Sequence, residues 1–164
     1  MKIQILILAF LTKSLTLFAQ KNQTIEQEIL NADSILFVTH KATDGFVIIN
    51  DSTNEKKYPD RVVVNGVPNY SVITQRILVS NISRHRLVDI LKIKGNDRLI
   101  KTCMTFIPFH AILIFKNSIC SYIDISFGCN SILVPSFQEA PFTIKREKTK
   151  KLESLFESLD IETK

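Results

Sequence analysis

Cysteine and histidine, the residue types best suited to nucleophilic catalysis or metal binding, gather in one stretch of this chain. The stretch runs from Cys103 to Cys129 and contains all three cysteines of the sequence and one of its three histidines, His110. A cysteine activated by a nearby imidazole can act as a nucleophile. Cysteine and histidine can also bind zinc, and two cysteines can form a disulfide in an oxidising compartment. The sequence therefore offers three kinds of chemistry at one place.

The elements around these residues decide which of them can meet. Residues 109–115 and 120–127 are apolar and rich in β-branched side chains, which predicts two strands joined by a short turn. An antiparallel hairpin of this kind places Cys103 and Cys129 at one end and Cys120 at the other, beside the turn. We therefore expect a Cys103–Cys129 disulfide, provided that the two Cα atoms come within about 4.4 to 6.8 Å. Cys120 is then a packed free thiol.

His110 is expected at the same end of the hairpin as Cys103 and Cys129, which leaves other interpretations open. The three side chains could form a metal site or a thiol enzyme, or the thiols could all stay unpaired. Six residues separate Cys103 from His110, eighteen separate His110 from Cys129, and the chain contains no CxxC motif. This spacing matches no zinc signature. We therefore favour a disulfide with a structural histidine, and expect no metal and no cofactor.

Other polar side chains give weaker signals. His40 ends a predicted strand and His85 lies in the basic first turn of a predicted helix, so we expect both at the surface. Asp124 interrupts an apolar strand, and we expect it to point outward. A buried carboxylate there would need a partner such as Tyr70, Lys94 or a backbone donor.

The two central strands also have a predicted register. In a tight hairpin Phe115 lies opposite Cys120, and His110 lies opposite Ile125. Alternation then places His110 on one face and Asp124 on the other. Both faces are largely apolar, so we expect the hairpin at the centre of the sheet, with helices covering at least one side.

Capping residues and apolar periodicity predict the remaining elements. Three helices are expected, at residues 25–32, 84–92 and 150–159. Their predicted N-caps are Thr24, Ser83 and Thr149. Further strands are expected at residues 34–40, 46–50, 61–64 and 70–80. The first two of these strands are expected to pair as a hairpin. The predicted fold is a single α+β domain with a mainly antiparallel sheet of five or six strands and two or three packed helices.

The N-terminus has the layout of a secretory signal peptide. Lys2 precedes an apolar run from Ile3 to Leu11, and the small residue Ala19 stands just before the first polar segment. Polar residues 12–14 interrupt the run, which leaves it short of the roughly 20 apolar residues that a membrane-spanning helix needs. We expect residues 1–19 to be a signal peptide, residues 20–164 to form the mature domain, and the protein to be periplasmic or secreted. An uncleaved N-terminal anchor is the alternative.

Charge argues against a nucleic-acid partner. The chain has a net charge of +5, which falls to +3 when Lys2 and Lys13 leave with the signal peptide. The basic residues are dispersed except at residues 145–151, beside a predicted helix start, where a solvated surface explains them. A mature chain of 145 residues fits one domain with a real core.

A pattern of cysteine, proline and histidine spans the second half of the chain. Its residues are Cys103, Pro108, His110 to Phe115, Tyr122 and the I-S-F-G-C run that ends at Cys129. From about residue 83 onwards the chain resembles a group of small exported proteins of unknown function from Gram-negative bacteria. In that group a Cys, a Pro-x-His and a Cys-Phe-x-Cys element precede a C-terminal amphipathic helix. Ser126 stands where the first cysteine of the last element would be, so the resemblance implies one ligand fewer for any shared metal site.

These observations predict a non-catalytic binding or structural module of the cell envelope, stabilised by a Cys103–Cys129 disulfide. A metal-binding protein or thiol enzyme centred on Cys103, His110 and Cys129 is the alternative. The candidate binding residues are Cys103, His110, Ser126 and Cys129. The expected partner is a small molecule or another envelope protein. We expect none of these residues to be catalytic.

Overall fold

In the computed structural model, the described parts of the chain are residues 24–41, 61–92, 106–136 and 141–163, with three short strands at 48–49, 56–57 and 98–99. The predicted signal peptide, Cys103 and Lys94 lie outside these residues, so the predictions that concern them remain predictions. No helix within the described residues is long and apolar enough to cross a membrane.

A seven-stranded sheet forms the centre of the domain, and all its neighbouring strands pair antiparallel. In spatial order the strands are β6 (Ile73–Leu78), β1 (Ser34–His40), β8 (His110–Lys116), β9 (Ile119–Ser126), β10 (Ser131–Leu133), β11 (Phe142–Ile144) and β7 (Arg98–Leu99). Six of these strands have three or more residues, and the two-residue strand β7 adds one at the edge. The α+β class with a mainly antiparallel sheet is therefore confirmed.

The hairpin of β8 and β9 has the predicted register. Phe115 pairs with Cys120, and His110 pairs with Ile125. Asn117 and Ser118 form the turn with φ values of 51° and 65°. Positive φ at both turn residues is the geometry that matches the twist of a two-residue hairpin. The hairpin lies inside the sheet, between β1 and β10.

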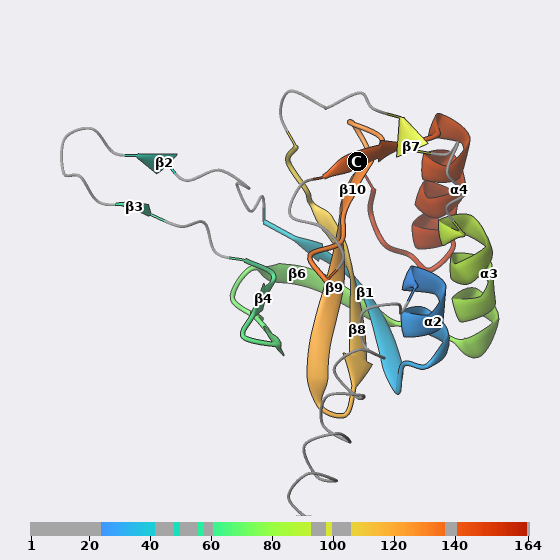
Figure 1. Cartoon of the computed structure of the whole chain (residues 1–164), viewed down its shortest axis with the longest axis horizontal. Coiled ribbons are helices and arrows are strands. Elements are labelled where there is room, and N and C mark those ends of the chain that lie inside the picture. The colour runs from blue at the N-terminus through green and yellow to red at the C-terminus, as the bar shows by residue number, and fades with distance from the viewer. Residues whose placement is uncertain are drawn as a thin grey trace, which may run out of the picture.

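All three described helices cover one face of the sheet (Figure 1). They are α2 (Ile25–Leu30), α3 (Asn81–Leu91) and α4 (Arg146–Glu157). The main core lies between them and the sheet and includes Phe37 of β1 and Phe156 of α4. Their rings stack with centroids 4.1 Å apart, and both side chains are fully buried.

A smaller core lies on the opposite face of the sheet. It contains Val38, Ala111, Leu113 and Cys120 from the sheet, covered by Val62 and Val63. The covering segment carries the small pair β4 (Val63–Val64) and β5 (Val67–Pro68), which Figure 1 shows on the side away from the helices. The Cys120 N–H donates to the Gly66 carbonyl at 2.9 Å. The central strands are therefore buried on both faces.

Three predicted details differ from the structure. β1 does not form a hairpin with residues 46–50, because β6 and β8 occupy its two edges, and β2 (Ile48–Ile49) pairs instead with β3 (Lys56–Lys57). Helix α3 starts earlier than predicted, because the Ser80 side chain caps it by accepting from the Ser83 N–H. Helix α4 also starts earlier, at Arg146, with no side-chain cap that the sequence could signal.

Candidate functional site

Three of the four predicted binding residues meet in one hollow at an end of the sheet. His110, Ser126 and Cys129 line a cavity of about 620 Å³, which we call the sheet-end pocket. The hydroxyl-bearing Thr39 and Thr74 and the ring of Phe109 complete much of its wall. The fourth predicted residue, Cys103, lies outside the described residues.

His110 stands at the first position of β8, where the strand begins beside the pocket. Its Nε2 lies 2.7 Å from the Glu162 carbonyl oxygen, so Nε2 carries the proton and Nδ1 is left as an acceptor in the neutral ring. The ring packs against Phe127 and Phe156, at centroid distances of 4.9 and 5.9 Å. Burial lowers the pKa of His110, and the bond to Glu162 opposes this effect. The site therefore presents a neutral imidazole.

The C-terminal segment after α4 forms another wall of the pocket. Ile161 is buried in the main core and anchors this segment. The Gln75 side chain donates to the Asp160 carbonyl at 2.6 Å and accepts from the Glu162 N–H at 3.4 Å. Together with the bond to His110, these contacts hold Glu162 and Thr163 beside the pocket.

The pocket combines neutral polar groups with aromatic rings. The hydroxyls of Thr39 and Thr74 lie 2.8 Å apart and bond to one another. Ser126 is buried, whereas the Phe109 side chain is 50% exposed. Among the described lining residues there is no lysine or arginine, and Glu162 is the one carboxylate. The lining therefore suits an uncharged or weakly basic molecule.

Two of the three cysteines, Cys120 and Cys129, lie within the described residues. Cys120 is a free, buried thiol at the turn end of the hairpin, and burial raises its pKa to about 11. Such a thiol is protonated at neutral pH and is a poor nucleophile. Cys129 lines the pocket and is not free. Within the described part of the chain, no three His, Cys, Asp or Glu side chains are grouped as a metal site.

A second pair of polar side chains lies beside the pocket and was not predicted. His40 Nε2 is 3.8 Å from Asp124 Oδ1, and their side chains are 0% and 9% exposed. Neither atom has a hydrogen-bond partner. The prediction that both residues face solvent is therefore wrong, because Val62 and Val63 cover this face of the sheet. His85, in contrast, is exposed as expected.

Burial shifts both members of this pair toward their neutral forms. It raises the pKa of Asp124 to about 7, although the positive charge of Arg61 opposes the rise. Burial also lowers the pKa of His40, and the hydrogen bond to the Lys41 carbonyl opposes this decrease. An aspartate inside an apolar strand was the one sequence signal for this pair. Its partner lies on a strand far away in the sequence.

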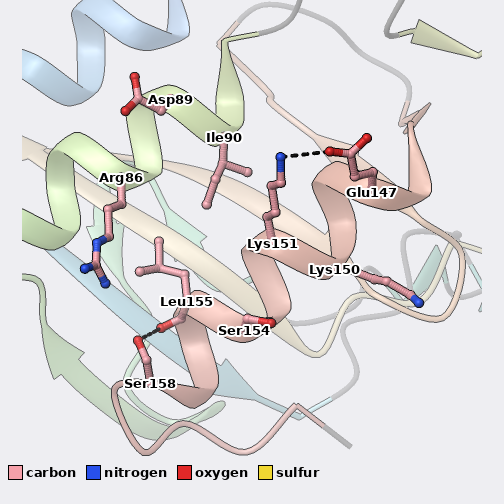
Figure 2. Close-up of a pocket in the computed structure, with 9 residues that line it drawn as sticks. All are labelled: Arg86, Asp89, Ile90, Glu147, Lys150, Lys151, Ser154, Leu155 and Ser158. Atoms are coloured by element: carbon pink, nitrogen blue, oxygen red, sulfur yellow. Dashed lines mark hydrogen bonds and ion pairs between the residues drawn. The ribbon is translucent and has the colours of Figure 1, made fainter.

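A different hollow of about 530 Å³ lies between α3 and α4 (Figure 2). Ile90 and Leu155 give it an apolar floor, and charged side chains surround this floor. Glu147 and Lys151 on this rim bond to each other at 2.8 Å, and both are largely exposed. Exposed side chains such as these lose conformational freedom when a ligand fixes them, which weakens binding.

Comparison of the chain with protein-family models, with curated proteins and with solved structures gives no match. The resemblance of the second half of the chain to small exported proteins therefore remains a prediction.

Proposed function

We propose that this protein is a non-catalytic binding module of the cell envelope that holds a small molecule in the sheet-end pocket. The observation that carries this proposal is that His110, Ser126 and Cys129 line one cavity of about 620 Å³ together with aromatic rings and hydroxyls. Binding sites for small molecules are commonly cavities of about 300 to 1,000 Å³, with apolar walls and a few convergent polar groups.

The lining indicates the class of ligand. His110 offers a neutral acceptor nitrogen, and the hydroxyls of Thr39, Thr74 and Ser126 can donate or accept. The exposed ring of Phe109 offers a face for stacking. We therefore expect an uncharged or weakly basic molecule that carries an aromatic ring and one or two hydrogen-bonding groups.

A Cys103–Cys129 disulfide belongs to the same proposal. Cys129 is not free, Cys120 is a free thiol, and the chain has three cysteines, which leaves Cys103 as the available partner. Such a bond would tie the segment before β8 to the loop after β9 beside the pocket. The export that an envelope protein requires is supported by the N-terminal sequence pattern.

The experiment that tests binding is a screen of uncharged, ring-containing fragments by saturation-transfer NMR on residues 20–164. Fragments that bind are then titrated against the Phe109→Ala variant. Loss of a stacking ring is expected to weaken binding about three- to tenfold. Phe109 is half exposed, so this truncation leaves the core intact.

Tyr70→Ala is the matched control, because Tyr70 is a similarly exposed ring, 54% accessible, that does not line the pocket. It should leave fragment affinity unchanged. Equal losses in the two variants, or no binding fragment at all, would contradict the proposal.

A further inference from the structure

The His40 and Asp124 side chains form a buried polar pair for which the proposed binding function has no use. His40 Nδ1 lies 2.8 Å from the Lys41 carbonyl oxygen. A carbonyl only accepts, so Nδ1 must carry the proton of this bond. In the neutral ring Nε2 is then an acceptor, and it faces Asp124 Oδ1 at 3.8 Å.

Two acceptor atoms that face each other inside the protein need a positive charge or a proton between them. Neither His40 Nε2 nor Asp124 Oδ1 has a hydrogen-bond partner, and at 3.8 Å the two atoms do not bond to each other. An ionised carboxylate beside a neutral ring would leave both lone pairs unsatisfied in a low-dielectric environment, which is costly. A proton on Asp124 turns its carboxyl into a donor toward the ring, and the two side chains must then approach from 3.8 Å to hydrogen-bond distance.

We propose that His40 and Asp124 hold one proton in common, and that the sheet-end pocket changes shape when this proton leaves. His40 lines the pocket directly, so a movement of its ring alters the pocket wall. This second part rests on the proposed binding function, whereas the shared proton does not.

The backbone around His40 has a feature that permits such a movement. The register of β1 with β6 shifts between Thr39 and His40, a bulge-like irregularity. Bulges alter the direction of side chains and interrupt the ladder. Beyond the bulge, the His40 N–H donates to the Phe109 carbonyl and the Lys41 N–H to the Val72 carbonyl, each at 2.9 Å. Repulsion between the deprotonated side chains would act on these two bonds.

Among the described residues, the charged and titratable groups around the pair come from three other segments. They are His110 of β8, Tyr122 of β9 and Arg61 ahead of β4. Burial lowers the pKa of His110 and raises the pKa of Tyr122, so both are neutral near pH 7. The positive charge of Arg61 favours loss of the proton from Asp124, and the burial of Asp124 opposes this loss. Two of these neighbours act on the pair, since a charge on His110 lowers the pKa of His40 and the charge of Arg61 lowers the pKa of Asp124.

NMR of the wild-type protein tests the shared proton without any variant or ligand. The carboxyl carbon of Asp124 should titrate with a midpoint near 7 instead of near 4. Long-range ¹H–¹⁵N spectra should show His40 protonated at Nδ1. An ionised Asp124 beside a neutral His40 at pH 6 would overturn the proposal. A stoichiometric metal ion bound between the two side chains would also overturn it.

Hydrogen exchange then tests the effect on the pocket. After correction for intrinsic rates, protection of the His40 and Lys41 amides should fall at least threefold as pH rises through the Asp124 midpoint. The amide shifts of Thr39 and Thr74 should move with the same midpoint. Asp124→Asn supplies a permanent donor and should remove both changes, whereas Asp89→Asn on the exposed side of α3 should keep them. If Asp124 titrates near 7 while these amides do not respond, the result contradicts the proposed change in pocket shape but agrees with the shared proton.

Discussion

The Nε2 atom of His40 lies 3.8 Å from the Oδ1 atom of Asp124, although the two residues belong to strands that do not pair. Strand β8 runs between them, and its residue Ala111 pairs with Val38 on one side and Asp124 on the other.

This relationship predicts an unusual dependence of stability on pH. Burial raises the pKa of Asp124 from 3.8 to about 7, so the folded protein holds a proton that the unfolded chain releases near pH 4. The stability that Asp124 contributes is therefore fully present below about pH 4 and is lost as pH rises through 7. The change corresponds to at most about 4 kcal/mol.

The measurement is denaturant unfolding of the wild-type protein and Asp124→Asn between pH 4 and 8. The variant should gain stability relative to the wild type as pH rises. The lowered pKa values of His40 and His110 act in the opposite sense, reducing stability as pH falls below 6.5, but both proteins share them. A difference between the two proteins that is constant with pH would show that Asp124 is already ionised.

His110→Phe is predicted to loosen the C-terminal segment. The phenyl ring keeps the packing against Phe127 and Phe156 but cannot donate to the Glu162 carbonyl. Glu162 is exposed, so water can replace the bond, and the expected loss is about 0.5 to 1.5 kcal/mol. Carboxypeptidase should digest the variant faster than the wild type. Equal rates would show that the Gln75 bonds alone hold the segment.

The thiols are predicted to react unequally. In the native protein none should react with iodoacetamide, because Cys120 is buried and its pKa is raised to about 11. After unfolding without reductant, mass spectrometry should find one alkylated thiol, at Cys120, and a linked Cys103–Cys129 peptide. Reduction should cost on the order of 3 kcal/mol of stability. Three alkylated thiols would contradict the disulfide and reopen the thiol-enzyme and metal interpretations.

Phe156→Ala is predicted to cost about 3 to 5 kcal/mol, because it removes a fully buried ring that stacks on Phe37. Ile82→Ala on α3 is the control, since Ile82 is 71% exposed and should change stability by less than about 0.5 kcal/mol. Chemical unfolding of both variants provides the measurement. Similar losses would show that α4 packs less tightly than its contacts indicate.

The hairpin at the centre of the fold was predictable because two local signals agree. Long β-branched runs flank a short turn, and a period of two residues fixes which side chains share a face. The pairing of His110 with Ile125 follows from these alone. The position of His110 and Cys129 at one end of the hairpin was predictable to the same extent, whereas the cavity that they line was not.

What could not be predicted depends on contacts between distant segments. Asp124 is buried because the segment around Val62 and Val63 folds over β9, and no local pattern signals this. His40 meets Asp124 because β8 inserts between β1 and β9. The start of α4 was missed because Lys145 provides no side-chain cap, while Thr149, the predicted cap, lies buried inside the helix.

Chemical-shift mapping tests most directly whether the sheet-end pocket binds a small molecule. The ¹H–¹⁵N spectrum of the protein would be recorded while the tightest uncharged, ring-containing fragment is added. We predict that the largest shifts fall on Thr39, Thr74, Phe109 and His110. Shifts that instead gather at Arg86 and Lys150, which line the hollow between α3 and α4, would contradict binding in the sheet-end pocket.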